Sequence, residues 1–234
     1  MSSNTLHRLA VSLLLLAALA APGCVSERGP APGMALLGDE PAPVDPQRLH
    51  LELIEKMLED GRAHAALAHL DALPPEEAAV PSAQLLRAEA LRRTGQLDAA
   101  WRVYEPLLAT DAAAAAWRGL ALIKAEQGDL ATSAAWLRRA RDLQPTVARI
   151  RNDLGYALIL SGDLEAARIE LVTALELESS RRTARNLVLV FLLDNQLEAA
   201  QRLAQHHGID EAGFQRLQRR AERLRARIAQ RGDT

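Results

Sequence analysis

The chain has 234 residues, of which 25% are charged and 49% hydrophobic, and its formal net charge is -2. This length allows one or two domains with a buried core, and the charge balance argues against a strongly steered nucleic-acid binder. Aromatic residues make up only 3%, while alanine and leucine dominate, which is typical of closely packed helices. The single cysteine, Cys24, excludes an intrachain disulfide and any zinc site built on two thiolates.

Residues 1–23 are typical of a bacterial secretion signal. Arg8 precedes an uncharged run over residues 9–21, which is too short for a membrane span of roughly 20 apolar residues. The stretch LAALAAPGC resembles a lipoprotein signal with Cys24 as the acylated residue, although Ala21 and Pro22 depart from the usual pattern. The alternative is cleavage near Ala21 with Cys24 as a free thiol. Acylation predicts a cell-envelope protein anchored in the membrane, and Val25 favours the outer membrane, facing the periplasm.

Residues 24–46 are predicted to form a disordered tether after the lipidated cysteine. The segment contains five prolines and three glycines, with few charges, most of them acidic. Proline removes backbone donors and fixes φ, so neither a helix nor a sheet is expected to persist. The segment would hold the following domain away from the membrane, or serve only as a spacer.

From residue 47 onward the sequence repeats itself. Five copies of a turn motif such as SGDLEAARIEL follow one another at spacings of 34, 33, 34 and 33 residues. Apolar residues at helical spacing precede and follow each turn. The turn position carries a residue that tolerates the left-handed conformation at the end of a helix. These residues are Gly61, Gly95, Gly128, Gly162 and Asn195.

The repeat resembles the tetratricopeptide repeat (TPR), with Trp117 at the family's first-helix tryptophan and Pro145 at its closing proline. Small residues of the second helices fall where paired helices approach closely. They are Ala66, Ala100, Ser133, Ala167 and Ala200. The resemblance implies an all-α fold, a right-handed TPR solenoid of about five helix-turn-helix repeats over residues 47–209.

A basic helix is predicted over residues 210–231, with Asp210 as its N-cap. Its apolar residues form a narrow seam. They are Phe214, Leu217, Ala221, Leu224 and Ile228. The favoured interpretation is a helix that caps the last repeat; the alternative is a coiled-coil contact with a second copy or a partner.

The sequence contains no set of residues typical of a catalytic or metal site. It lacks GxGxxG, GxxxxGK[ST], GxSxG and HExxH motifs, and His64 and His69 lie five apart rather than at chelating i, i+4 spacing. Glu76 and Glu77 follow two prolines and are expected in a solvated loop. We therefore expect no enzyme, no cofactor, no metal, no small-molecule substrate and no nucleic acid.

What remains is a binding surface, because the first helices of TPR proteins line a groove that commonly holds a partner segment. Arginine and asparagine on these helices can bond a peptide backbone or a carboxylate, and Tyr156 adds an apolar contact. For each position an ordinary solvated side chain is an equal alternative. The candidate groove residues are Arg118, Arg149, Asn152, Tyr156, Arg182, Arg185 and Asn186.

The lipoprotein-like signal, the tether and the short array together resemble TadD-type lipoproteins of the Tad/Flp pilus system. The stretch NDLGYALILSGDLEAARIELVTALEL carries this resemblance, which covers about residues 80–230. It implies an adaptor that binds protein partners of a pilus or secretion complex, such as the secretin. The alternatives are a type IV pilus pilotin, another outer-membrane assembly factor, or an accessory to cell-wall enzymes.

Overall fold

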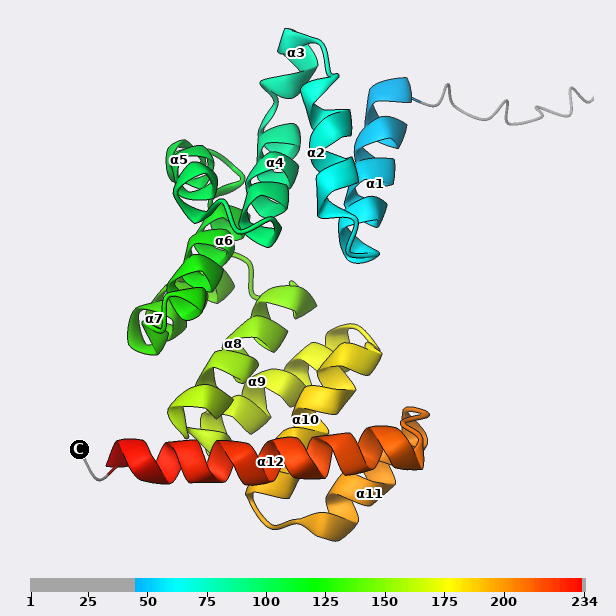
Figure 1. Cartoon of the computed structure of the whole chain (residues 1–234), viewed down its shortest axis with the longest axis vertical. Coiled ribbons are helices and arrows are strands. Elements are labelled where there is room, and N and C mark those ends of the chain that lie inside the picture. Colours follow the sequence, from blue (N-terminus) through cyan, green and yellow to red (C-terminus); the bar gives the residue numbers. More distant parts are fainter. Residues whose placement is uncertain (1–44, 233–234) are drawn as a thin grey trace, which may run out of the picture. The chain divides into compact units, whose positions relative to one another are not determined.

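The computed structural model describes residues 45–232, and side chains up to residue 230. The predictions for residues 1–23, for Cys24 and for nearly all of the tether lie outside the described residues. Within residues 45–232 the structure is helical and contains no strand (Figure 1). This confirms the predicted all-α repeat fold.

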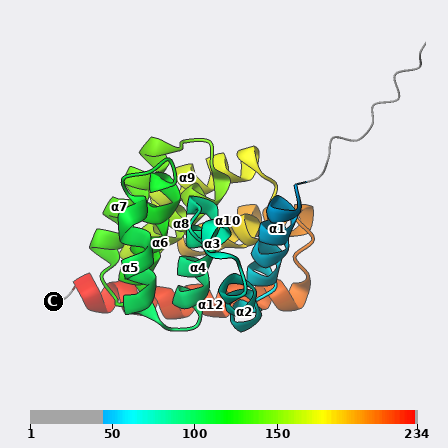
Figure 2. The same cartoon turned by 90° about the horizontal axis from the view of Figure 1, so that it is seen from above.

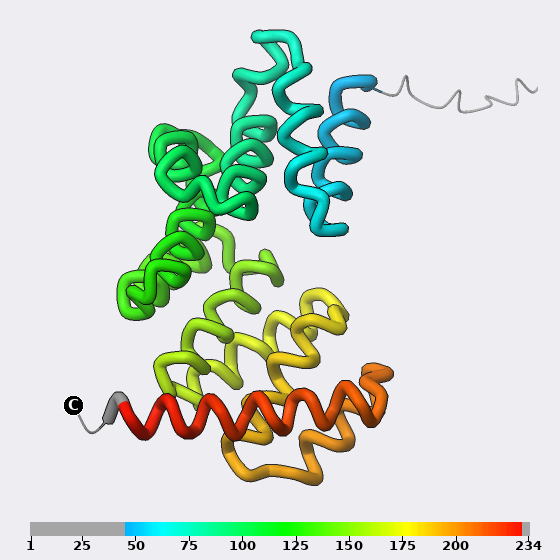
Figure 3. Tube along the Cα trace, in the orientation of Figure 1, coloured from blue at the N-terminus to red at the C-terminus, as the bar shows by residue number. Residues whose placement is uncertain are grey.

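The helices follow one another as five antiparallel pairs, with a one-turn helix between the first two pairs and a final single helix. The trace shows the pairs as successive hairpins (Figure 3). The first helices of the pairs are α1 (Pro46–Glu59), α4 (Pro81–Arg93), α6 (Ala113–Glu126), α8 (Ala148–Ser161) and α10 (Arg181–Leu193). The second helices are α2 (Ala63–Asp71), α5 (Leu97–Leu107), α7 (Leu130–Leu143), α9 (Leu164–Leu177) and α11 (Leu197–His206). The last helix is α12 (Glu211–Gly232).

Two local features differ from the sequence-based predictions. Helix α1 begins at Pro46, one residue inside the predicted tether, because proline suits the first helical position and Asp45 caps it through the backbone N–H of Gln47. The expectation of a loop at Glu76 and Glu77 was wrong. These residues belong to a one-turn helix, α3 (Pro75–Ala78), whose first position is again a proline and whose first turn is acidic.

The turn between the helices of each pair depends on a residue with positive φ. Gly162 has φ of +86° and caps α8, and Asn195, the non-glycine member of the series, has φ of +59°. The residue after the turn is the N-cap of the second helix, and in two pairs its side chain caps the helix. Asp129 and Asp163 each accept a hydrogen bond from a backbone N–H three residues ahead, at 3.1 and 3.2 Å.

The helices of a pair approach closely because small residues lie between them. The second-helix positions Ala66, Ala100, Ser133, Ala167 and Ala200 are all fully buried. On α8 the corresponding first-helix position is Gly155, where a Cβ atom would lie 2.5 Å from Cγ of Leu171. This contact leaves no room for a larger side chain unless Leu171 shifts.

Helix α12 packs against α10 and reaches α8 (Figure 1, Figure 2). Four residues of its predicted seam, Phe214, Leu217, Ala221 and Leu224, are buried in the same core cluster as the last two pairs. Asp210 Oδ1 accepts from the backbone N–H of Gly213 at 2.8 Å, as an N-cap does. The chain itself therefore covers most of the seam.

No helix within residues 45–232 combines the length and the apolar character needed to cross a bilayer.

Candidate functional site

The candidate site is the side of the first helices that carries the predicted groove residues, called here the first-helix face. It is defined by the seven predicted groove residues on α6, α8 and α10. Arg118, Asn152 and Asn186 occupy equivalent positions, 34 residues apart, in these three successive helices. The helical hairpins place equivalent positions next to each other, so one repeat period in sequence becomes one step across the face.

Side-chain amides form a ladder along this face. Asn186 donates through Nδ2 to Oδ1 of Asn152 at 2.9 Å, and Asn152 donates through Nδ2 to Oδ1 of Asp153 at 3.1 Å. All three residues are buried. The predicted groove residues Asn152 and Asn186 therefore use their amide donors inside the protein, where these bonds satisfy polar groups withdrawn from water.

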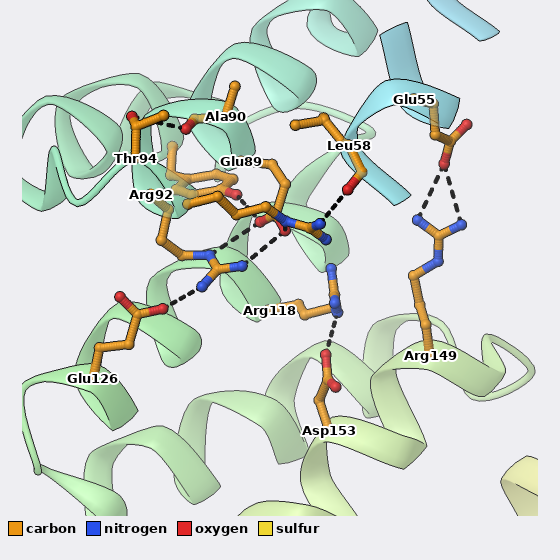
Figure 4. Close-up of polar contacts among 12 residues, drawn as sticks. Glu55, Leu58, Glu89, Ala90, Arg92, Thr94, Arg118, Glu126, Arg149 and Asp153 are labelled. Atoms are coloured by element: carbon orange, nitrogen blue, oxygen red, sulfur yellow. Dashed lines mark hydrogen bonds and ion pairs between the residues drawn. The ribbon is translucent and has the colours of Figure 1, made fainter. Parts of the chain in front are cut away.

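Asp153 completes the ladder with two arginines. It accepts from Arg118 Nε at 2.6 Å and from Arg182 Nη2 at 3.1 Å. The Arg118 and Asp153 side chains are 14% and 3% exposed, whereas that of Arg182 is 68% exposed. Burial lowers the pKa of Arg118, but the charges of Asp153 and Glu89, with the hydrogen bond to Asp153, together outweigh burial and the net shift is upward. Arg118 is thus a buried cation that holds α6 to α8 (Figure 4).

A second ionic cluster lies on α4 and was not predicted. Glu89 accepts from Arg92 on its own helix (Figure 4). It also accepts from Arg93 of that helix and from the Tyr104 hydroxyl at 3.2 Å. Burial raises the pKa of Glu89, but the hydrogen bonds and charges of the arginines outweigh it and lower the pKa to about 2. Spacings of three and four residues were a sequence signal for these pairs, but not for their burial.

Tyr104 is held against Glu89 by a close helix contact. It is 2% exposed, and its ring lies over Gly119 of α6, where a Cβ atom would overlap it. Burial raises the pKa of the Tyr104 hydroxyl, which therefore stays protonated and donates to Glu89. Gly119 is a residue whose role the sequence did not reveal.

Arg149 joins two distant helices. Its Nη1 and Nη2 donate to Oε1 of Glu55 on α1 at 3.3 and 3.2 Å, a contact 94 residues apart in sequence (Figure 4). Their side chains are 60% and 44% exposed, so the pair contributes little stability. A hollow of about 490 Å³ lies beside it, lined by apolar residues of α1, α4 and α6 and by charges of both signs.

The Tyr156 side chain contacts the last helix, α12. Arg220 of α12 donates through Nη2 to the Tyr156 hydroxyl at 2.5 Å, and its guanidinium carbon lies 5.0 Å from the centre of the ring. This combines a hydrogen bond with a cation–π contact. The predicted apolar contact for a partner is therefore partly covered by the chain's own arginine.

A recess of about 400 Å³ lies where α8, α10 and α12 meet, and we call it the arginine pocket. Its lining residues are Tyr156, Arg181, Arg182, Arg185, Asn186 and Arg220. Four of the seven predicted groove residues meet here. Arg118, Arg149 and Asn152 do not line it, and Arg181 and Arg220 were not predicted.

Four of the five histidines in residues 45–232 contact another histidine. His50 Nε2 lies 3.2 Å from His69 Nδ1, and the rings of His206 and His207 are in edge contact. Within residues 45–232 no three histidine, cysteine or acidic side chains gather in a way that could hold a metal ion.

No protein-family model matches the chain. Over 176 residues, 75% of the chain, it is 39% identical to "TPR repeat-containing protein PA4299" of Pseudomonas aeruginosa and covers 70% of that protein. Among solved structures it is similar to TTC0263, a TPR protein of Thermus thermophilus, with a TM-score of 0.61 and 20% identity. That match covers 76% of this chain and 98% of the other, and at this identity it supports the fold alone.

A second solved structure is a mutant O-GlcNAc transferase of Thermobaculum terrenum. The TM-score is 0.51 and the identity 30%, over 58% of this chain but only 27% of the transferase. The likeness is confined to a minor part of that enzyme. The identity and coverage of the Pseudomonas relative, with the five helical pairs and their turn residues, show that the chain belongs to the family of TPR repeat-containing proteins.

Proposed function

We propose that the protein is a non-catalytic adaptor whose first-helix face binds a segment of another protein. The observation that carries this proposal is the arginine pocket, a recess on that face with Arg185 exposed. TPR folds typically act as protein-interaction scaffolds. Binding sites are concave, and a small number of placed polar groups fix the orientation of the ligand.

A binding role is also favoured by how the buried acidic groups are used. Glu89, Asp153 and Glu170 each accept from two arginines. Asp153 and Glu170 hold neighbouring helices together in this way, Glu89 is paired within its own helix, and all three are explained without a reaction. Arg181 and Arg185 of the pocket, in contrast, form no hydrogen bond or ion pair with another residue of the described range 45–230.

The finer proposal is a lipoprotein of the Tad/Flp type. It rests on the resemblance of the repeats to TadD-type proteins and on the lipoprotein-like signal that ends at Cys24. The protein would be anchored at the outer membrane, face the periplasm, and assist assembly or placement of the pilus secretion complex, with the secretin as the first candidate partner.

The test is affinity capture of the tagged full-length protein from gently solubilised membranes, with the bound proteins identified by mass spectrometry. We expect recovery of the secretin or another Tad/Flp component. The variant Arg185→Glu should lose this partner, whereas Arg138→Glu, an exposed arginine of the second helix α7, should retain it. Recovery of wall-modifying enzymes or β-barrel assembly proteins instead would contradict the pilus role.

A further inference from the structure

The arginine pocket carries more positive charge than the described chain neutralises. Four of its six lining residues are arginines and none is a carboxylate. Arginine remains protonated at any physiological pH. The pocket therefore concentrates like charges that repel each other, which costs free energy in the absence of an anion.

The existing contacts of these arginines confirm the imbalance. Arg182 shares the single carboxylate of Asp153 with Arg118, so two cations face one anion. Arg220 is bonded to the neutral hydroxyl of Tyr156. Arg181 and Arg185 are exposed, and neither forms a hydrogen bond or ion pair with another residue of the described range 45–230.

We infer that the arginine pocket binds an acidic segment of a protein partner, rich in aspartate or glutamate. The inference rests on the proposed binding role of this face and specifies its ligand. Arg181 and Arg185 would take carboxylates, for which the planar guanidinium offers two parallel donors. Asn186 has its amide donor committed to Asn152, and its carbonyl oxygen can accept a backbone N–H.

The size and the lining of the pocket fit carboxylate side chains of a peptide. Its volume of about 400 Å³ lies in the range of roughly 300–1,000 Å³ found for ligand pockets. The Tyr156 ring adds an apolar wall to the charged groups. The pocket is also a recess between three helices, α8, α10 and α12, and Arg181 and Arg185 at its rim are exposed.

The experiment measures binding of a fluorescein-labelled decapeptide of glutamate to the full chain in detergent micelles, by fluorescence polarisation. A glutamine decapeptide is the matched probe. The pocket variant is Arg181→Gln/Arg185→Gln. The control is Arg102→Gln/Arg138→Gln, which removes the same charge from exposed positions of α5 and α7.

We expect preference for the glutamate peptide, a loss of about tenfold or more in the pocket variant, and a change of about twofold or less in the control. If the melting temperature of the double variant falls, Arg185→Gln alone replaces it, with Arg138→Gln as control. Equal losses in the pocket and control variants would overturn the inference, because they would indicate diffuse electrostatic attraction. Equal binding of both peptides would overturn it too.

Two further measurements distinguish a peptide-binding pocket from a membrane-binding one, and this inference from the adaptor function. The first is a flotation assay that measures binding to phosphatidylglycerol vesicles. If the pocket variant binds the vesicles less than the control does while peptide binding is unchanged, the pocket binds a membrane surface and the inference is wrong. If the pocket variant still captures the wild-type partner from membranes, this inference fails while the adaptor function stands. Loss of that partner in the pocket variant alone supports both.

Discussion

Glu89, Arg118 and Asp153 are ionisable residues that lie largely out of solvent on three successive first helices. Taking a charge out of water is costly unless a partner of opposite charge and hydrogen bonds replace the water. Each of the three meets this condition through the contacts described above. Glu89 joins α4 to α5 through Tyr104, and Arg118 joins α6 to α8 through Asp153.

Glu89→Gln tests the energetic role of this cluster. The pKa of Glu89 is lowered from 4.5 to about 2 in the folded protein. The carboxyl therefore binds protons more readily when unfolded, and it stabilises the fold above about pH 4.5 and loses this effect as the pH falls toward 2. We expect the variant to lower the free energy of unfolding by about 2–3 kcal/mol at pH 7.

Urea denaturation from pH 7 to pH 2.5 measures this effect. The difference between wild type and variant should shrink steadily below about pH 4.5. Glu165→Gln is the matched control, because Glu165 pairs only with Arg168 of its own helix and is 69% exposed. A difference that stays constant with pH would show that Glu89 acts through its shape and not through its charge.

Sequence alone predicted which residues lie on the first-helix face, but not which of them are buried. Helical periodicity places Arg118, Asn152 and Asn186 on one side of their helices. Whether such a side chain meets water or a neighbouring helix depends on contacts between repeats. The hydrogen bond between Arg118 and Asp153 is such a contact, because the two residues lie 35 positions apart in the chain. Neither composition nor local spacing predicts it.

At the scale of the element, each helical pair is specified by two local signals. A glycine or asparagine provides the left-handed turn, and a small residue in the second helix allows close approach. Both signals are local in sequence, which is why the helical pairs could be predicted. The path of α12 could not, because its contacts with Tyr156 and with α10 join segments that are far apart in the chain.

Ala167→Arg tests the close approach within the fourth pair. Ala167 is 0% exposed, so arginine there must bury a charge or force α8 and α9 apart. We expect the free energy of unfolding to fall by about 3 kcal/mol or more, and the melting temperature to drop by about 10 °C. Circular dichroism melting of the purified variant measures both.

The control for this variant lies on the same helix. Ile169 is 56% exposed, so Ile169→Arg should change stability by about 0.5 kcal/mol or less. An unchanged melting temperature in Ala167→Arg would mean that the repeat register is wrong at this position.

At the scale of the whole molecule, the prediction concerns anchoring. Acyl chains at Cys24 would contribute about 0.8 kcal/mol per buried methylene, enough for stable attachment when several chains are present. We expect Cys24→Ser to move the protein from the membrane to the soluble fraction on cell fractionation. Tight membrane attachment of this variant would contradict lipid anchoring. A folded, soluble variant would show that the repeat array does not need the lipid anchor to fold.

The central claim is that the first-helix face binds the partner. Photo-cross-linking in cells tests this claim most directly. A photoreactive benzoylphenylalanine replaces Arg185 in the full-length protein, and Arg138 on α7 provides the matched position. We predict a light-dependent covalent adduct with an envelope protein from position 185 and none from position 138. Absence of an adduct at 185, or equal yields at the two positions, would contradict a partner-binding role for this face.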